Sequence, residues 1–233
     1  MNAFRLLLPL SALLLWACNQ SRDYLLPHTL TVFPADSGLY RISLVLDTTY
    51  STQGPVADLY YKKEVQGGFE TDLSGRSIQV LRTFRSPLDR GTDYLFQADR
   101  VWSQYYNPEA AGAHFAERMV ENVRQLVLKF PVHPSVSWNG NLYNTRGDQI
   151  FRYQNVDTTV TAGGQTFEHC VVVLQKAPTQ SFISQTYAYE IYAPQVGLIK
   201  KYDRTLVFDG PQGQFNPDKS RIYIEELVEY GRE

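Results

Sequence analysis

The chain has 233 residues, in which 22 Lys and Arg stand against 24 Asp and Glu, for a formal net charge of −2. Domains that bind nucleic acid usually carry a basic stripe, so this balance argues against such a partner. A chain of this length can bury about 70% of its unfolded surface and needs no metal or disulfide to fold. The 16 Tyr and 12 Phe residues favour strands over helices.

Residues 1–18 have the pattern of an export signal. Met1–Arg5 carries one positive charge, Leu6–Leu15 is apolar apart from a proline and a serine, and Leu15-Trp16-Ala17-Cys18 follows. A charged start, a short apolar run and a small residue before the cut are the marks of a signal peptide. The apolar run is far shorter than the roughly 20 residues that span a bilayer.

A cysteine directly after the cut resembles the cleavage motif of bacterial lipoprotein precursors, although Trp16 stands where that family usually has a smaller residue. The resemblance implies cleavage before Cys18 and acylation of Cys18, and two or more acyl chains anchor a protein stably. We therefore expect a signal peptide over 1–17, a tether over 18–28 and a single β-rich domain over 29–233. Asn19 after the cysteine favours the outer membrane, on its periplasmic side or at the cell surface.

The first half of the mature chain reads as strands. Alternating apolar and polar residues and turn signals predict strands over Leu39–Thr49, Val56–Val65, Ile78–Phe84, Tyr94–Ala98 and Val101–Tyr106. In the first of these, Tyr40, Ile42, Leu44 and Leu46 alternate with Arg41, Ser43, Val45 and Asp47. That pattern is typical of a half-buried strand.

The segment from Asn107 to Phe130 is ambiguous. Asn107-Pro108-Glu109 is a good helix start, with a capping Asn and Pro at the first helical position. Apolar residues then recur at helical spacing, but the part after Val123 also fits a strand. We predict one short helix near 108–118 and a strand over about 122–130, and helix against strand stays open over 116–130.

The second half has clearer hairpins. Asn-Gly within Trp138-Asn139-Gly140-Asn141 is the strongest short hairpin signal, and Ala162–Gln165 forms a second tip. Further strands are predicted over Val156–Thr161, Thr166–Leu174, Ile183–Tyr192, Leu198–Phe208 and Arg221–Tyr230, with a loop over Asp209–Lys219. Because these connections are short, the strands should pair antiparallel.

The expected fold class is therefore mainly β, or α+β at most, with antiparallel sheets arranged as a partly open barrel or sandwich. A match between Leu46-Asp47-Thr48-Thr49 and Val156-Asp157-Thr158-Thr159 leaves open two related halves, 29–106 and 120–233. Chance explains a match of four residues about as well.

The layout of the mature chain resembles small β-rich lipoproteins of unassigned function from Gram-negative bacteria. The resemblance is carried by Pro34, Gly38-Leu39-Tyr40, Phe130-Pro131, Trp138-Asn139-Gly140-Asn141 and Val196-Gly197-Leu198-Ile199. It implies an architecture and no mechanism.

No catalytic, cofactor or metal motif follows the leader, so no catalytic residue, metal ligand or cofactor is predicted. Once Cys18 is acylated, Cys170 is the only thiol left, and it lies in an apolar strand. Neighbours in a strand point to opposite faces, so His169 cannot activate Cys170. The other histidines, His28, His114 and His133, are scattered along the chain.

Acidic residues are the remaining candidates for hidden chemistry. Seven aspartates fall near predicted turns or strand ends: Asp47, Asp58, Asp72, Asp89, Asp157, Asp203 and Asp209. A glycosidase needs two carboxylates at a set separation, but turn aspartates commonly bond their own backbone. We interpret these residues as turn formers.

The aromatic excess is the one positive sign of a binding function. Tyrosines gather on predicted strands: Tyr60, Tyr61, Tyr105, Tyr106, Tyr187, Tyr189 and Tyr192. These rings form either a binding groove or an aromatic β core. A groove would stack on sugars or take up acyl chains. The two alternatives differ in exposure, because core rings are buried and groove rings are open to solvent.

Three function classes remain. The leading hypothesis is a non-enzymatic lipoprotein of the cell envelope, held to the membrane by acylated Cys18, that binds a glycan, lipid or protein. The alternatives are a carrier of lipid or another hydrophobic ligand, similar to half-barrel lipoprotein chaperones, and a carboxylate-dependent glycan hydrolase.

Overall fold

The computed structural model describes residues 29–88, 94–107, 114–210 and 213–233. A short 3-10 helix, η1 (Thr29–Val32), precedes twelve strands that form one antiparallel sheet. The first six are β1 (Leu39–Ser51), β2 (Gly54–Thr71), β3 (Ser77–Pro87), β4 (Gln97–Asn107), β5 (His114–Val120) and β6 (Val123–Phe130). The others are β7 (Ser137–Asn139), β8 (Ile150–Ala162), β9 (Gln165–Gln180), β10 (Ser184–Ala193), β11 (Gly197–Val207) and β12 (Asn216–Arg232).

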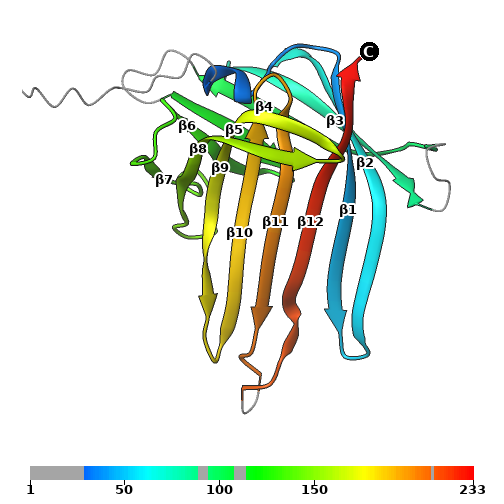
Figure 1. The fold of residues 1–233 in the computed structure, drawn as a ribbon, viewed down its shortest axis with the longest axis vertical. Coiled ribbons are helices and arrows are strands. Elements are labelled where there is room, and N and C mark those ends of the chain that lie inside the picture. Colours follow the sequence, from blue (N-terminus) through cyan, green and yellow to red (C-terminus); the bar gives the residue numbers. More distant parts are fainter. Residues whose placement is uncertain (1–28, 89–93, 108–113, 211–212) are drawn as a thin grey trace, which may run out of the picture.

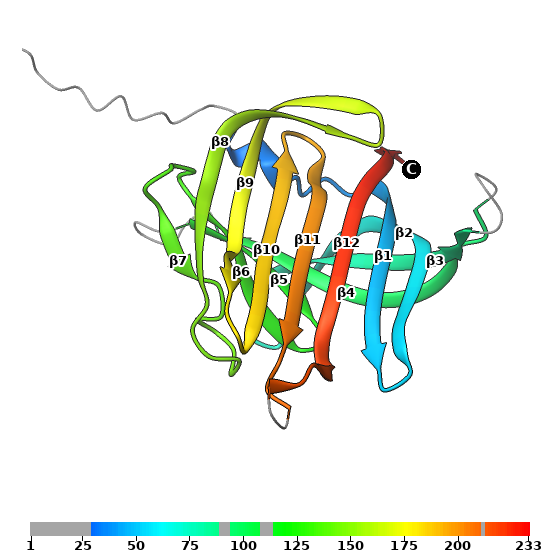
Figure 2. The ribbon, with the colours of Figure 1, turned by 60° about the horizontal axis from the view of Figure 1, so that its bottom comes forward.

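The sheet order is β6-β5-β4-β3-β2-β1-β12-β11-β10-β9-β8-β7, so the first strand pairs with the last. The sheet curls until its two ends meet, where the Leu126 N–H donates to Gly140 O and the Trp138 Nε1–H donates to Leu126 O, both at 2.9 Å. Figures 1 and 2 show β10, β11, β12 and β1 on one side and β3 to β6 crossing behind them. The mainly β, antiparallel, partly open barrel-like architecture is confirmed.

The main apolar core fills one end of the curled sheet, between β5 and β6 on one side and β8 to β10 on the other. Its buried members include Leu126, Leu128, Phe130, Trp138, Phe151, Tyr153, Val173 and Tyr192. The Trp138 ring contacts the rings of Phe151 and Tyr153, at centroid separations of 5.9 and 5.0 Å. This cluster packs β6, at one end of the sheet, against β7 and β8 at the other end.

A second apolar cluster lies under the β8–β9 hairpin, which bends across β10, β11 and β12 (Figure 1). It comprises Ala162, Phe167, Cys170, Ile191, Ala193, Val196, Ile199 and Leu227. The predicted tip at Ala162–Gln165 is confirmed, because Gly163 and Gly164 have φ of 54° and 77°, the left-handed values that a two-residue turn demands. Cys170 is fully buried, as the sequence predicts.

The predicted helix near 108–118 is wrong for the part that the structure describes. Residues 114–120 form β5, which pairs with β6, the predicted strand over 122–130. Glu121 and Asn122 make the turn between them with φ of 51° and 62°. Because the turn lacks glycine, the apolar residues on both sides read as one helical run; residues 108–113 lie outside the described ranges. None of the described helical segments is long and apolar enough to span a membrane.

Two further expectations need correction. Trp138–Asn141 is not a hairpin tip, because β7 ends at Asn139 and pairs with β8 only from Ile150, across a long loop. Gly140 serves packing there, since a Cβ on it would lie 2.4 Å from the Phe151 ring. The predicted loop over Asp209–Lys219 is shorter than expected, since β12 begins at Asn216.

Candidate functional site

The β8–β9 hairpin positions an open concave site. Its tip rests on β12, where the Gly163 N–H donates to Glu226 Oε1 at 3.0 Å. A Cβ on Gly163 would lie 2.3 Å from the carbonyl oxygen of Leu227, so only glycine permits this close approach.

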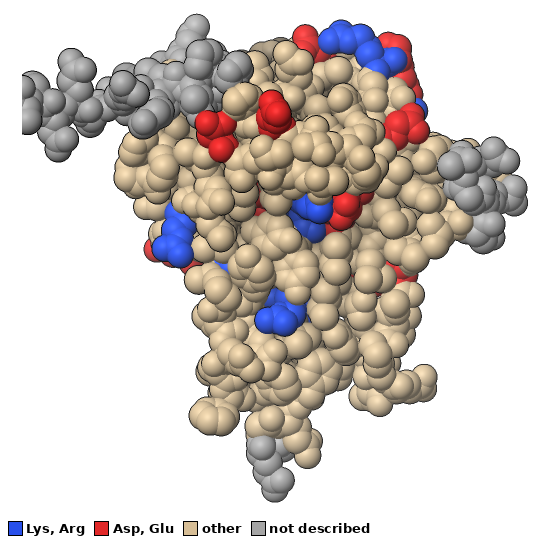
Figure 3. All heavy atoms as spheres, in the orientation of Figure 1, with Lys and Arg blue, Asp and Glu red and all other residues tan. Residues whose placement is uncertain are grey.

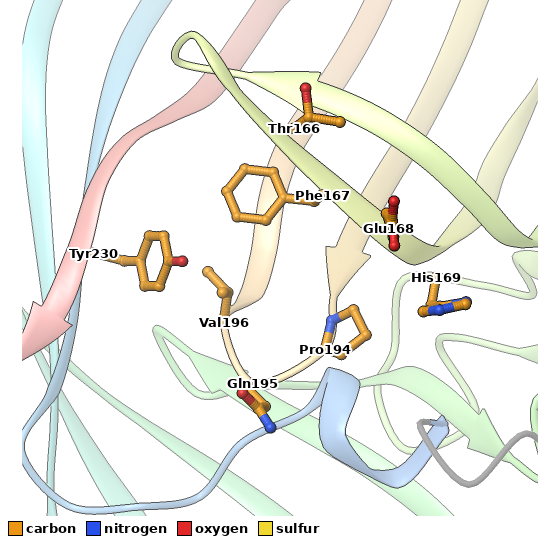
Figure 4. A pocket seen from close by; sticks show the side chains of 8 residues that line it. All are labelled: Thr166, Phe167, Glu168, His169, Pro194, Gln195, Val196 and Tyr230. Carbon is orange, nitrogen blue, oxygen red and sulfur yellow. The ribbon is translucent and has the colours of Figure 1, made fainter.

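Between the hairpin, the β10–β11 turn and the end of β12 lies an open pocket of about 530 Å³. Figure 4 shows its lining residues: Thr166, Phe167, Glu168, His169, Pro194, Gln195, Val196 and Tyr230. Phe167, Tyr230 and Val196 form one wall, with the two ring centroids 5.9 Å apart. Glu168 and His169 lie on the other side, so the pocket has an apolar wall and a polar rim.

The β10–β11 turn forms the floor of the pocket, and hydrogen bonds to Arg41 and to η1 hold it in place. Arg41 Nη1 donates to Val196 O at 3.2 Å. The Gln195 N–H donates to Thr31 O at 2.8 Å, which ties the turn to η1. A Cβ on Gly197, whose φ is +86°, would lie 2.3 Å from Arg41 Nη1. The β10–β11 turn is therefore a fixed part of the site.

Two non-glycine residues with positive φ lie where the hairpin bends. Asp157 and His169 have φ of 62° and 55°, a conformation that costs a residue with a Cβ roughly 1–2 kcal/mol. Asp157 Oδ1 and His169 Nδ1 bond to each other across the two strands. This pair fixes the bend, and His169 also lines the pocket.

The interior of the curled sheet holds a cluster of charged side chains, which we call the ionic cluster. Six members are buried, and the seventh is Lys201, whose side chain is 30% exposed. The buried members are Arg41, Lys62, Glu64, Arg118, Glu190 and Glu225. Lys62 Nζ lies 2.5 Å from Glu225 Oε1, and Lys201 Nζ lies 2.7 Å from Glu190 Oε1. Arg41 pairs with Glu64.

Neighbouring hydroxyls complete the ionic cluster. Tyr192 Oη donates to Glu190 Oε2 at 2.5 Å, and Tyr223 Oη donates to Glu225 Oε2 at 2.8 Å. Burial, which disfavours the charged form, raises the pKa of both tyrosines, and the neighbouring carboxylates raise it further. The hydroxyls therefore stay protonated and donate to the carboxylates.

Burial and charged neighbours shift the pKa of several groups in the ionic cluster. Burial alone would raise the pKa of Glu225, but the Lys62 ammonium and the Tyr223 hydroxyl outweigh it and hold that pKa at about 2. The pKa of Glu190 is lowered in the same way by Lys201 and Arg118. Burial, with the positive charge of Arg118, lowers the pKa of Arg41 to about 10. Arg41, Glu190 and Glu225 are therefore ionised at neutral pH.

Cys170, His133 and His114 lie in separate parts of the fold. Cys170 lies inside the second apolar cluster, where burial raises its pKa to about 11. His133 bonds to Ser135, and His114 lies on β5; Cys18 and His28 lie outside the described residues. Across the described ranges, no group of three His, Cys, Asp or Glu could hold a metal ion.

The predicted aspartates are mostly bound to cations rather than to turn backbone. Asp47 bonds Arg221, Asp58 bonds Arg85, Asp72 bonds Arg76, Asp157 bonds His169, Asp203 bonds Lys176 and Asp209 bonds Lys219. Asp72 also accepts the backbone N–H groups of Ser74 and Arg76, as a turn aspartate does. Asp89 lies outside the described residues.

The tyrosines of β10 divide between the two faces of the sheet. Tyr192 is fully buried in the interior, whereas Tyr187 and Tyr189 lie half-buried on the opposite face of β10. There they contact Tyr202 of β11, whose ring stacks on that of Tyr189 at 5.6 Å. Tyr60 and Tyr105 lie instead against Arg85 and Arg76, and nothing is described of the Tyr106 side chain.

The face that carries the tyrosine cluster is largely neutral, and we call it the outer face. Its half-buried members alternate with the residues of the interior and include Leu44, Leu46, Tyr187, Tyr189, Tyr202, Arg204, Ile222 and Ile224. Lys200 and Glu226 share this face and pair with each other. Figure 3 shows few charged side chains over this part of β10, β11, β12 and β1. The ionic cluster itself was missed by sequence reasoning, because each of its residues reads as the polar side of a half-buried strand.

No family model matches the chain, and no curated protein matches it. Among solved structures, the chain is similar to a candidate lipoprotein from Parabacteroides distasonis, with 13% identity, a TM-score of 0.33 and coverage of 86% of this chain and 98% of that one. A candidate exported protein with a YmcC-like fold from Bacteroides fragilis has 12% identity, a TM-score of 0.38 and coverage of 86% and 98%. A candidate outer-membrane lipoprotein-sorting protein domain from Vibrio parahaemolyticus has 10% identity, a TM-score of 0.20 and coverage of 84% and 86%.

Proposed function

We propose that this protein is a lipid-anchored, non-enzymatic protein of the cell envelope that binds a ligand in the pocket beside the β8–β9 hairpin. The supporting observation is the pocket itself, whose volume of about 530 Å³ lies within the range of roughly 300–1,000 Å³ of small-molecule sites. Rings on one wall and polar groups on the rim suit a ligand with an apolar face and hydrogen-bonding groups.

The state of the carboxylates favours binding over hydrolysis. A glycosidase keeps one carboxyl group protonated as the general acid, which requires a raised pKa. Here the neighbouring cations and hydrogen-bond donors lower the pKa of Glu190, Glu225, Asp72 and Asp209. These four groups are therefore held as carboxylates at neutral pH.

The interior favours an open pocket over an enclosed carrier cavity. A carrier of lipid would need an apolar space between its sheet faces, whereas this interior contains the ionic cluster and the packed apolar core. Charged groups cost free energy beside acyl chains unless they stay paired. The pocket beside the hairpin, by contrast, is open and partly apolar.

Native mass spectrometry of the mature protein from its host tests the pocket. We expect a ligand to accompany the wild-type protein, and Tyr230→Ala to weaken its binding by at least about tenfold, because exposed aromatic side chains often dominate binding energy. Tyr143→Ala is the matched control, since Tyr143 is similarly exposed, at 48% against 43%, and lies outside the pocket. Equal binding by both variants would contradict the proposal.

The anchor has a separate test. We expect the mature protein to begin at Cys18 and to carry lipid, and Cys18→Ser to move it from the membrane fraction to the soluble fraction. An intact mass that shows an unmodified cysteine would remove the anchor and leave the pocket proposal standing.

A further inference from the structure

We propose that the free edge of β8 binds an extended segment of a partner polypeptide by strand addition, above the outer face of β10, β11 and β12. This surface lies on the other side of the hairpin from the pocket, which β9 lines. The inference therefore stands independently of the proposed function.

The first observation is an open strand edge. β8 pairs with β9 along one side, but along the other side it pairs with β7 only over Ile150–Arg152. Within the described chain, residues 154–162 have no strand on that side. The other end strand, β6, is different, because its backbone bonds to Gly140, Trp138 and Tyr153.

The second observation is the composition of this edge, which is irregular only before Val160. Natural edge strands are blocked by charged residues, proline, bulges or a short length, because unpaired N–H and C=O groups recruit other chains. The β8 segment Gln154-Asn155-Val156-Asp157-Thr158-Thr159-Val160-Thr161 contains neither lysine nor proline. The register of β8 against β9 is irregular as far as Val160 and regular from Val160 to Ala162. The backbone of this last stretch therefore has the regular strand geometry that an added strand can pair with.

The third observation is the surface beneath this edge. Figures 1 and 2 show the hairpin crossing β10, β11 and β12, with β8 as the arm nearer the middle of these strands. Val160 and Tyr189 both pack on the second apolar cluster. A strand added about 4.8 Å from β8 would therefore lie over the row formed by Tyr189, Tyr202 and Ile224, which are opposite one another in register.

The fourth observation gives the partner its charge. Arg204 follows Tyr202 on the outer face, and its Nε is buried with no hydrogen-bond partner. The structure gives Arg204 no ion pair with any described residue, whereas the nearby Lys200 already pairs with Glu226. The partner segment should therefore be largely uncharged, with one acidic side chain that reaches Arg204.

Backbone groups distinguish this occupant from a lipid surface. A membrane would be drawn to the neutral rings but would leave the edge N–H and C=O groups of β8 unpaired away from water, which costs free energy. A polypeptide strand satisfies the edge and covers the rings at the same time.

The test uses a phage-displayed random nonapeptide library selected against the full mature protein. We expect enrichment of proline-free peptides with alternating β-branched residues and a single Asp or Glu. A synthetic peptide from this pool should lose about tenfold in affinity with Arg204→Gln, the loss of one charge-assisted contact. Peptides without the acid should bind the wild-type and R204Q proteins equally.

Edge variants and hydrogen exchange locate the binding site. Thr159→Lys and Thr161→Lys place charges on the edge of β8 and should abolish peptide binding. Thr179→Lys is the control and should not affect binding, because Thr179 is an exposed residue of β9 that lies away from this edge. Bound peptide should slow amide exchange over residues 158–162. Four results would each overturn the proposal. Two of them are a library selection without enrichment and protection from exchange that is confined to the pocket residues. The other two are protection that rises with protein concentration alone, and binding to phosphatidylethanolamine–phosphatidylglycerol vesicles that T161K abolishes.

Discussion

At the scale of single residues, the interior of this sheet depends on charges that cannot be removed one at a time. Lys62 and Glu225 are both buried and lie 2.5 Å apart. Burying two charges is costly, and the cost is offset only while each keeps its partner and its hydrogen bonds. Tyr223 supplies one of those hydrogen bonds.

We expect Glu225→Gln to lower the free energy of unfolding at pH 7 by about 3–5 kcal/mol, because it leaves the Lys62 ammonium buried without a counterion. Urea unfolding measures this loss. Glu226→Gln is the control: Glu226 is adjacent in sequence, but its side chain is 43% exposed and pairs with Lys200 at 3.3 Å. The control should change stability by less than about 1 kcal/mol, and an equal loss in both variants would contradict a special role for the buried pair.

Acid should weaken the same pair. The pKa of Glu225 falls from an ordinary value of 4.5 to about 2 in the folded protein, so the unfolded chain takes up this proton first as the pH drops. The stabilisation by Glu225 is complete above about pH 4.5 and is lost as the pH falls towards 2. Unfolding measured between pH 6 and 2 should show a shallower pH dependence for E225Q than for the wild-type protein. Parallel curves would show that Glu225 is not the titrating group.

Cys170 should be inert in the folded state. It is fully buried, and burial raises its pKa to about 11, whereas alkylating reagents attack the exposed thiolate. We expect iodoacetamide at pH 7.5 to leave Cys170 unmodified in folded protein and to modify it fully in urea, as read by intact mass. Rapid modification without urea would show that the hairpin does not cover it.

The sequence predicted the alternation of β1 but not which side faces inward. Alternation shows only that two faces differ, and the apolar side is the usual inner face. Here Arg41 and Ser43 point into the ionic cluster, while Leu44 and Leu46 stand on the outer face. The partners that make an inward Arg41 tolerable are Glu64 and the Val196 carbonyl, and the carbonyl comes from 155 residues away. A local pattern carries no information about them.

At the scale of elements, the contact between the tip of the β8–β9 hairpin and β12 depends on Gly163. We expect Gly163→Ala to lift the hairpin from β12, because its Cβ would lie 2.3 Å from Leu227 O. Gly164→Ala has a similar φ of +77° but no atom within 4 Å, so it should cost only the roughly 1–2 kcal/mol of a left-handed residue. Hydrogen exchange over residues 166–172 should accelerate in G163A more than in G164A. The same exchange in both variants would show that the tip contact does not hold the hairpin.

The sequence predicted elements whose turns carry glycine and missed those whose turns do not. Gly163-Gly164 marked the β8–β9 tip correctly, because glycine adopts positive φ without strain. Glu121-Asn122 makes an equivalent turn without glycine, so β5 was mistaken for a helix. At Asn139-Gly140 the signal was present, but the packing of Phe151 against Gly140 decided the outcome. Tertiary contacts override turn propensity at that position.

At the scale of the whole molecule, the chain ends of the sheet lie side by side. Leu39 at the start of β1 is opposite Arg232 at the end of β12, and the Glu233 N–H donates to Gly38 O at 2.8 Å. We expect a circular permutant of residues 29–233, joined by a short glycine linker and opened in the exposed turn at Thr52-Gln53, to fold, because that turn is solvent-exposed and such sites tolerate new termini.

Circular dichroism and cooperative urea unfolding check the permutant against the parent protein. A second permutant, opened between Glu225 and Glu226, is the control and should not fold, because it divides β12 within the ionic cluster. Folding of both, or of neither, would contradict the topology.

The pairing of β1 with β12 also determines when the sheet can be completed during synthesis of the chain. Tyr40 Oη donates to Glu229 Oε1 at 2.7 Å across 189 residues of chain, and contacts between such distant residues form slowly. While the chain emerges, β1 has β2 on one side and an open edge on the other until the last 17-residue strand arrives. A chain that stops short of β12 therefore exposes two strand edges at once, those of β1 and β11, and is open to proteolysis until β12 pairs with both.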